Sequence, residues 1–321
     1  MHNDLIIKPA IEVKNLEKVY LAKDKKKIQK TALRGINLTI NQGEIFGLLG
    51  PNGAGKSTFI NILAGLVIKS KGEVNINGFN LDTNVREARQ SIGVVPQELT
   101  LDPFFSPEDS LELQAGMYGV RKKNRKTKEI LSALKLNDVA KGYARRMSGG
   151  MKRRLMVGKA MVHSPPILVL DEPTAGVDVE LRRHLWEMVQ ELNKKGTTIL
   201  LTTHYIEEAE KLCDRIGILN EGDLVACDTK DKLLGLIDKK ELIVKFQDQF
   251  TSLPKSLNEL NPIILDNKTI KFIYQPSSSN FQSILDKINS CKLNIIDLEI
   301  NETDLEEVFL SITQKNKPIN L

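Results

Sequence analysis

The chain has 321 residues, of which 41% are hydrophobic and 27% are charged, and its formal net charge at pH 7 is +5. This is ordinary globular composition, its length suggests about two domains, and the charge is too small to identify a partner. No apolar run approaches the roughly 20 residues of a membrane-spanning helix. The N-terminal segment MHNDLIIKPA lacks the apolar core of a secretion signal, so we expect a cytoplasmic protein.

Three cysteines, Cys213, Cys227 and Cys291, lie far apart in the sequence. Their number is odd and their spacing matches no metal site. We therefore expect them to be buried free thiols, since an unpaired cysteine usually behaves as a small apolar side chain.

The first predicted elements are strands within residues 11–49, in the stretches IEVKNLEKVY, INLTI and EIFGLLG. A helix follows in KSTFINILAGL, because Phe59, Ile62, Leu63 and Leu66 have helical spacing. Between them, GPNGAGKST at 50–58 fits the pattern G-x-x-x-x-G-K-[ST]. A strand before this pattern and a helix after it are the context expected of a phosphate-binding loop.

The chemistry of this loop follows from its residue types. The glycines let backbone N–H groups curl around phosphate oxygens, and the helix N-terminus adds partial positive charge. Lys56 should reach the β- and γ-phosphates, and Ser57 should offer its hydroxyl to Mg²⁺. By itself the loop indicates only a nucleoside triphosphate, as in a kinase, a GTPase or an ATPase. The expected contacts are Gly50, Pro51, Asn52, Gly53, Ala54, Gly55, Lys56, Ser57 and Thr58.

A strand is predicted in SIGVVPQ at 91–97, and Gln97 at its end could sense Mg²⁺ and water. Residues 107–145 are predicted to be helical, and six of the eight residues of RKKNRKTK at 121–128 are basic. This basic run fits a solvated loop between helices, a contact with anionic lipid headgroups or, less well, a nucleic-acid contact. The stretch MSGGM at 147–151 then precedes another helix, KRRLMVGKAMVHS.

The next segment predicts a strand–helix–strand unit and therefore a parallel sheet. ILVL at 167–170 is a short, continuous apolar run typical of a strand buried on both faces, and TTILLTT at 197–203 is another. Asp178 can cap the intervening helix, which ends at Gly196. Its apolar stripe is Leu181, Leu185, Met188, Val189 and Leu192.

Three polar side chains follow these buried strands. Asp171, at the end of ILVLD, suits indirect coordination of Mg²⁺, and Glu172 can orient and deprotonate an attacking water. His204 follows the next strand. Because the carboxyl ends of parallel strands collect ligand sites, we expect it to contact the γ-phosphate or the water.

The rest of the chain carries no catalytic motif. IEEAEKLC predicts a helix, and RIGILNEGDLVA predicts a hairpin around 221–223. After about residue 238 the pattern is that of a small α+β domain, with strands in ELIVKFQ, IKFIY and KLNIIDLEI. In the last helix, Thr303 and Glu306 fit a capping box.

Together these motifs resemble the nucleotide-binding subunit of an ABC transporter over roughly residues 11–235. The resemblance implies an α/β fold of the P-loop NTPase class, with a mixed sheet core, an antiparallel β subdomain and a helical subdomain at about 98–162. Residues 239–315 would form the small C-terminal domain, with a regulatory or dimer-contact role. The similarity rests on Tyr20 as the adenine-stacking aromatic, GPNGAGKST, Gln97, MSGGM, ILVLDEP, AGVD at 175–178 and His204.

The resemblance also explains the second glycine-rich turn. In such ATPases two cassettes pack head to tail, and each ATP lies between one chain's Lys56 loop and the partner's turn Ser148–Gly149–Gly150, with Asp178 nearby. The serine can donate its hydroxyl, the glycines permit close approach, and the following helix directs its N-terminus at the γ-phosphate. ATP and Mg²⁺ are the implied cofactors.

Two departures resemble the export branch of the family. The usual signature ends in Gln where this chain has Met151, and the usual loop S-A-L-D is replaced by residues 175–178, AGVD. The missing serine hydroxyl is one neutral hydrogen bond, worth about 0.5–1.5 kcal/mol, so it should tune dimerisation and not abolish it. The tail NIIDLEINETDLEEVFLSIT is similar to the C-terminal domain of drug, lipid and polysaccharide exporter subunits.

The implied partners are a second copy of the chain or a paralogous cassette, and a separate integral membrane permease, which places the chain peripherally on the cytoplasmic face of the cell (inner) membrane. Phe104 and Phe105 are expected to contact that permease. The alternative is a soluble ABC ATPase acting on ribosomes or nucleic acid. A single cassette and the short gap from Gly50 to Ser148 argue against it, so no nucleic acid is expected. A non-hydrolytic regulatory subunit is disfavoured because the four catalytic positions are present: Lys56, Asp171, Glu172 and His204.

Overall fold

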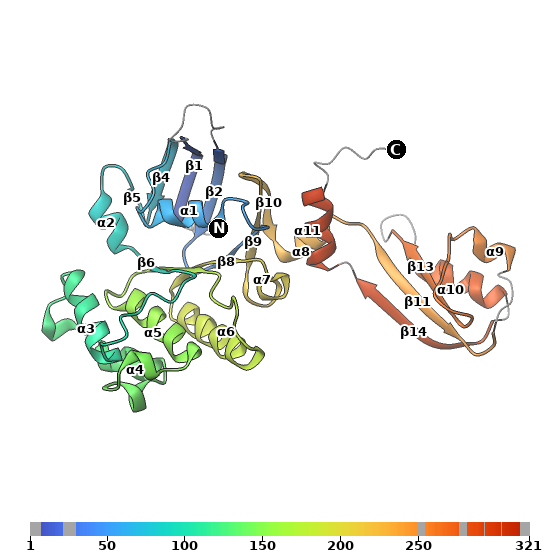
Figure 1. Cartoon of the computed structure of the whole chain (residues 1–321). Coiled ribbons are helices and arrows are strands. Elements are labelled where there is room, and N and C mark those ends of the chain that lie inside the picture. Colours follow the sequence, from blue (N-terminus) through green and yellow to red (C-terminus); the bar gives the residue numbers. More distant parts are fainter. Residues whose placement is uncertain are drawn as a thin grey trace, which may run out of the picture. The chain divides into compact units, whose positions relative to one another are not determined.

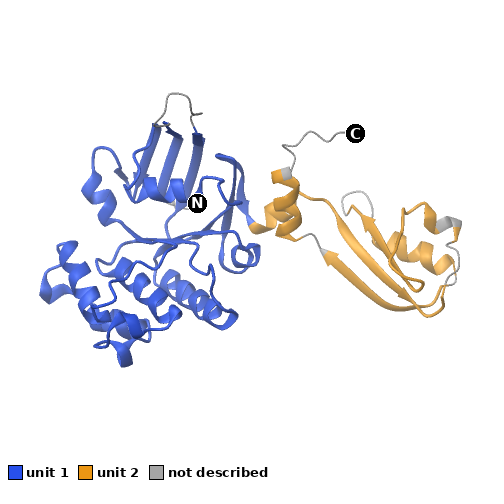
Figure 2. Ribbon diagram, viewed as in Figure 1, with its two compact units in different colours: residues 1–229 blue, residues 230–321 orange. Residues whose placement is uncertain are grey.

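The computed structural model describes residues 8–21, 30–249, 254–275, 281–291, 293–302 and 304–314. The chain divides into two compact units, Met1–Thr229 and Lys230–Leu321 (Figure 2). Among the described residues, no helix is long and apolar enough to cross a bilayer.

The first unit is built on a mixed six-stranded sheet with the order β10-β9-β3-β8-β7-β6 (Figure 1). The five strands from β9 to β6 are parallel, and β10 pairs with β9 as an antiparallel hairpin, as predicted. β8 lies between β3 and β7, so the strand ending in Asp171 is one strand removed from the phosphate loop. The strands are β3 (Ile45–Leu49), β6 (Ile92–Val95), β7 (Ile167–Asp171), β8 (Thr198–Thr203), β9 (Arg215–Asn220) and β10 (Asp223–Thr229).

Helices flank this sheet, which explains why all of β3 and β8 is buried. The predicted cap of α6 is present, because the Asp178 carboxylate accepts from the amide of Leu181 at 2.8 Å. In α6, α7 and α1, apolar residues face the sheet: α6 packs on β8, α7 on β3 and β8, and α1 on β7. These helices are α1 (Lys56–Leu63), α5 (Gly149–Met161), α6 (Val179–Lys194) and α7 (Ile206–Leu212).

The predicted antiparallel β subdomain is a four-stranded sheet with the order β2-β1-β4-β5. Its side chains share one core with the central sheet, in which Ile11 and Ile40 join Phe46 and Val169. A short helix, α2 (Val85–Gln90), leads from it to β6. The strands are β1 (Pro9–Tyr20), β2 (Lys30–Asn41), β4 (Lys71–Ile76) and β5 (Phe79–Asn80).

The helical subdomain is more broken than the continuous helical pattern predicted for 107–145. It contains α3 (Pro107–Met117), α4 (Thr127–Ala133) and 3-10 turns at 122–124, 137–139 and 144–146. Gly119 and Lys135 have φ of 73° and 52°, a left-handed geometry that ends a helix. In the basic run 121–128, Arg125 forms an ion pair of 2.7 Å with Glu112, whereas residues 121–123 are exposed.

The second unit starts at α8 (Lys230–Leu234), nine residues before the predicted domain start at 239. α8 belongs to this unit because it packs against α11 (Leu305–Gln314). An antiparallel sheet with the order β12-β13-β11-β14 carries a core with α10. Of the predicted capping box, Thr303 lies outside the described residues, and Asp304 accepts from the amide of Glu307 at 2.8 Å. The other elements are β11 (Lys240–Phe246), α9 (Lys255–Asn258), β12 (Ile263–Ile264), β13 (Thr269–Tyr274), α10 (Phe281–Ser290) and β14 (Ile295–Glu302).

None of the three cysteines forms a disulfide with another described residue, and only Cys213 is buried. Burial raises the pKa of its thiol well above the ordinary value. Cys227 and Cys291 are half-buried, so the expectation of full burial is wrong for both.

Candidate nucleotide-binding and catalytic site

The phosphate loop at 50–58 joins β3 to α1 at the carboxyl end of the parallel strands. Its glycines are dictated by close neighbours: a Cβ on Gly50 would lie 2.4 Å from the carbonyl oxygen of Leu219, and one on Gly55 would lie 2.6 Å from that of Ala32. Gly55 is the N-cap of α1, so the unpaired amides of the first helical turn are available to an anion.

A pocket of about 300 Å³ opens on this loop. Tyr20 lines one side, and its hydroxyl lies 3.5 Å from Thr58 Oγ1. Two loop residues that were predicted to contact phosphate, Gly50 and Ala54, do not line the pocket, and the side chain of Ala54 is buried. The lining residues are Tyr20, Lys30, Ala32, Pro51, Asn52, Gly53, Gly55, Lys56, Ser57, Thr58, Gln97 and Glu172.

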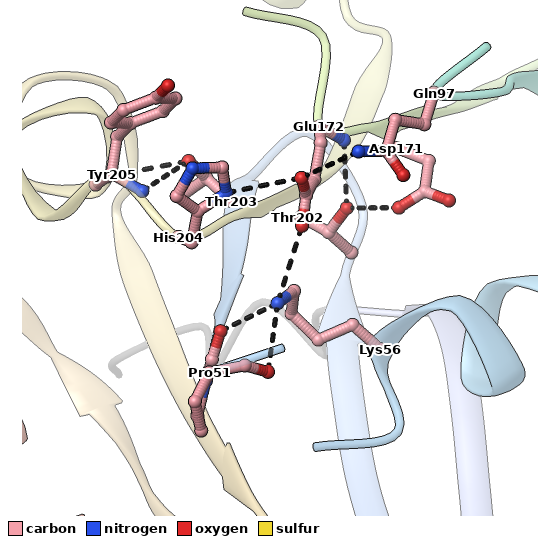
Figure 3. Close-up of polar contacts among 10 residues, drawn as sticks. Pro51, Lys56, Gln97, Asp171, Glu172, Thr202, Thr203, His204 and Tyr205 are labelled. Atoms are coloured by element: carbon pink, nitrogen blue, oxygen red, sulfur yellow. Dashed lines mark hydrogen bonds and ion pairs between the residues drawn. The ribbon is translucent and has the colours of Figure 1, made fainter. Parts of the chain in front are cut away.

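Glu172 is the point where the predicted catalytic residues meet (Figure 3). Its Oε1 lies 3.4 Å from Lys56 Nζ, its Oε2 accepts from Gln97 Nε2 at 3.0 Å, and the same oxygen lies 3.1 Å from His204 Nδ1. Lys56 Nζ also donates to the carbonyl oxygens of Gly50 and Pro51, at 2.6 and 3.3 Å. Three side chains from three other segments therefore converge on one carboxylate.

Thr202 joins the two acidic residues, and the sequence reasoning missed it. Its hydroxyl donates to Asp171 Oδ1 at 2.6 Å and accepts from the amide of Glu172 at 3.0 Å. Burial raises the pKa of Asp171, and the hydrogen bond from Thr202 opposes that rise. The doubled threonine before His204, at the end of a buried strand, is the signal that could have identified it.

The oxygen atoms available near Glu172 and the phosphate loop are of the kind that binds a magnesium ion. Mg²⁺ prefers oxygen ligands and commonly keeps several waters besides one or two carboxylates and the substrate phosphates. Asp171 supplies a carboxylate, Ser57 an exposed hydroxyl on the loop, and Gln97 a side-chain amide oxygen. Within the described part of the chain, no group of three or more His, Cys, Asp or Glu side chains forms an all-protein metal site.

The turn Ser148–Gly150 lies in a different pocket, of about 380 Å³. Ser148 is the N-cap of α5 and accepts from the amide of Met151 at 3.3 Å, which leaves its hydroxyl proton to donate. A Cβ on Gly150 would lie 2.4 Å from Leu181 Cδ2, whereas one on Gly149 would meet nothing within 4 Å. Asp178 lines the same pocket. Among the residues that the structure describes, no residue lines both this pocket and the phosphate-loop pocket.

Arg153, also missed from the sequence, connects this turn to Gln97. Arg153 is 5% exposed, and its guanidinium donates to the carbonyl oxygens of Gln97 and Pro96, at 2.7 and 3.1 Å. The signal was a basic residue one helical turn beyond Ser148, in a helix that packs against β6. The helix that carries Ser148 is thereby tied to the loop that carries Gln97.

Comparison with known proteins identifies the family. The family model described as ABC transporter matches residues 33–175. The linearmycin resistance ATP-binding protein LnrL of Bacillus subtilis strain 168 is 34% identical over 311 residues, which cover 94% of this chain and 98% of that relative. The chain belongs to the ABC transporter ATP-binding proteins. It is thus an ATP-binding subunit with the ATPase chemistry of that family, as the resemblance of its motifs implied.

Further comparisons agree with the family. The Nod factor export ATP-binding protein I of Burkholderia lata is 42% identical over 199 residues, 61% of this chain and 66% of that protein. A solved ATP-binding subunit of an ABC transporter superposes with a TM-score of 0.62 at 31% identity and covers 71% of this ABC protein and 92% of its own chain. The dimeric post-hydrolysis cassette MJ0796, bound to ADP and Pi, has a TM-score of 0.60 at 28% identity over 68% of this chain and 98% of its own.

Proposed function

We propose that this ABC protein is the ATP-hydrolysing subunit of an export system, which drives a separate membrane permease as two cassettes pair around ATP. The observation that carries the proposal is the separation of the two pockets within one chain. The phosphate-loop pocket has the groups for phosphate and water, and the pocket of Ser148 has a hydroxyl donor and a helix N-terminus but no lysine from the loop. Each chain therefore presents two half-sites.

We assign the first half-site to ATP. Tyr20 would stack on the adenine, and the loop amides and Lys56 would hold the phosphates. Ser57, Asp171 and Gln97 would hold Mg²⁺, which would supply positive charge to neutralise the phosphates. Glu172 accepts the proton of the attacking water, because its carboxylate lies where Gln97 and His204 converge.

We assign the second half-site to the partner's ATP. Gly149 has open space around its α-carbon, and Ser148 is exposed, so a phosphate group can approach both from outside the chain. The following helix, α5, adds the partial positive charge of its N-terminus. Asp178 and Ala175 line the same pocket and would face the partner cassette. Loss of the γ-phosphate after hydrolysis would then remove the contact that holds the two cassettes together.

The export role and the permease rest on relatives. LnrL is named for linearmycin resistance and its Burkholderia relative for Nod factor export. Phe104 and Phe105 are 69% and 41% exposed, close in sequence to Gln97, and we assign them to the permease contact. The chain would then act peripherally at the cytoplasmic face of the membrane. We assign the second unit to dimer contact or regulation, and the exposed basic residues 121–123 to anionic lipid.

The test uses Glu172→Gln, which keeps the shape of the side chain and cannot accept the proton. Hydrolysis should fall about 10²–10⁴-fold, as for the loss of a general base, while ATP binding persists. The variant should accumulate as an ATP-dependent dimer in size-exclusion chromatography with Mg²⁺, and adding Ser148→Arg should remove the dimer. A Glu172→Gln chain that binds ATP yet stays monomeric, alone and with the permease, would contradict the shared site.

A further inference from the structure

Glu208 is a buried carboxyl close to the catalytic residues, with no part in the chemistry described so far. It lies on α7, four residues beyond His204, and is 0% exposed. Burial raises the pKa of this carboxyl, and the neighbouring polar side chains of Thr203, Trp186 and Thr174 oppose the rise. A buried carboxyl costs stability unless hydrogen bonds compensate it, so an apolar residue would serve better if packing were the only need.

The contacts of Glu208 divide between its two oxygens. Oε1 accepts from the indole Nε1 of Trp186, on α6, at 3.0 Å. Oε2 and the hydroxyl oxygen of Thr174 are both buried, and neither has a hydrogen-bond partner within the described ranges of the chain. The two groups are complementary in either charge state: the Thr174 hydroxyl can donate to an ionised Oε2, and a protonated carboxyl can donate to the Thr174 oxygen while Oε1 still accepts from the indole.

Thr174 stands inside the turn that separates the general base from the residues of the second half-site. The amide of Ala175 donates to the carbonyl of Glu172 at 3.1 Å, and the amide of Val177 donates to that of Thr174 at 3.2 Å. This turn ends at Asp178, the cap of α6. Thr174 is 1% exposed, whereas residues 175–178, which follow it in the turn, are half-buried or exposed.

The other neighbour, Thr203, leads directly into His204. Its hydroxyl accepts from the amide of Tyr205 at 2.9 Å and so shapes the loop that carries the histidine. Glu208 therefore lies between the turn after Glu172 and the loop of His204, and the hydrogen bond from Trp186 fixes the position of its carboxyl group. One side chain fixes the spacing between the two loops.

We propose that Glu208 is a positioning residue, which holds the turn 172–178 against the loop of His204 and thereby places the general base and the partner-facing residues together. This inference rests on the proposed ATPase mechanism. It assigns to Glu208 no contact with nucleotide or water; the effect passes through Thr174 and Thr203.

The experiment uses the full chain with three substitutions and one control. Thr174→Val keeps the shape and removes the hydroxyl, Glu208→Leu removes both polar contacts, and Glu208→Gln keeps an acceptor for Trp186 and a donor for Thr174. The matched control is Glu207→Gln, on the same helix, whose exposed carboxylate pairs with Lys211 at 2.7 Å. Turnover number, KM and ATP affinity are measured for each, together with fluorescence, because Trp186 is the sole tryptophan of the chain.

Thr174→Val and Glu208→Leu should each lower kcat about tenfold, the cost of one unsatisfied buried group, with ATP affinity within about twofold of wild type. The double variant should be no slower than Glu208→Leu, because both changes break one link. Glu208→Gln should retain wild-type kcat and tryptophan emission, and Glu208→Leu should shift the emission.

The inference is overturned if Thr174→Val turns over ATP like wild type, or if kcat and ATP affinity fall together in the shape-preserving variants. Thr174→Val decides the matter even if Glu208→Leu does not fold, since valine matches threonine in volume. Failure of the proposed function would be seen separately, as absence of ATP turnover in the wild-type chain and in Glu207→Gln.

Discussion

Replacing Arg153 tests whether α5 and the loop of Gln97 move as one body. Arg153→Met keeps an unbranched, apolar side chain of similar length and removes both hydrogen bonds to the carbonyls of Pro96 and Gln97. Arg153→Lys keeps the charge but not the planar fork of donors. Lys152→Met, one residue earlier, is the matched loss of charge.

The magnitude follows from the contacts. Hydrogen bonds to a charged group are worth about 1.5–3 kcal/mol each, but removing the buried guanidinium also removes its desolvation cost. Pro96 and Gln97 are exposed, so water can take over at their carbonyls. The net loss of folding free energy should therefore be about 1 kcal/mol, a Tm shift of roughly 2–4 °C for a unit of this size.

The effect on turnover should be larger than the effect on stability. Gln97 reaches Glu172 only while its loop is held, and the loss of one such bond corresponds to about a tenfold fall in kcat. Steady-state hydrolysis, ATP affinity and thermal melting of the three variants measure this. The reasoning fails if Arg153→Met lowers Tm but hydrolyses ATP as fast as Lys152→Met does.

Three further outcomes can be checked. Phe104→Ser with Phe105→Ser should abolish export and leave ATP binding intact; unchanged transport in cells would refute the assigned permease contact. A chain truncated after Thr229, at the boundary between the units, should still bind ATP and retain partial hydrolysis, and a folded truncation without nucleotide binding would refute this. His163 stacks on Tyr118, and burial lowers the pKa of its imidazole in the folded state. The neutral, buried histidine therefore contributes to stability above about pH 6.5, the ordinary pKa of histidine. This contribution is lost as the pH falls from there toward the lowered pKa of the folded state. His163→Phe should therefore gain in Tm relative to wild type between pH 7 and 5, and a constant difference over that range would speak against it.

The motifs were predictable because their chemistry is local. Loop glycines, a cap such as Asp178 and continuous apolar strands are each recognisable within a few residues, and the parallel sheet then brings strand ends together. Gln97, Glu172 and His204 could be placed at one edge for this reason, and the structure brings Gln97 Nε2 and His204 Nδ1 to 3.0 and 3.1 Å from Oε2 of Glu172.

The residues that were missed act through tertiary contacts. Thr202, Arg153 and Glu208 owe their places to partners 31, 56 and 22 residues away in sequence, and the local signals at Thr202 and Arg153 do not reveal those partners. The second unit begins at α8, ahead of the start expected at 239, because α8 packs against α11 at the far end of that unit. Helix ends at Gly119 and Lys135 depend on single left-handed residues, which a periodic pattern does not reveal.

Under the proposed shared site, the two glycines of the Ser148 turn are required by different contacts, Gly150 by its own chain and Gly149 by the partner's ATP. A side chain at Gly150 is excluded by Leu181 of the same chain, whereas among the described residues no atom would contact a Cβ at Gly149 within 4 Å. Natural variation should therefore separate them. Consider a pair of different chains in which only one of the two shared sites still hydrolyses ATP. The chain that lends its Ser148 turn to the inactive site can then accept a substitution at Gly149 and still fold. A substitution at Gly150 would instead push α5 away from Leu181 on α6. The identity of residue 149 thus records whether the opposite site is under selection, and that of residue 150 records only that the cassette folds.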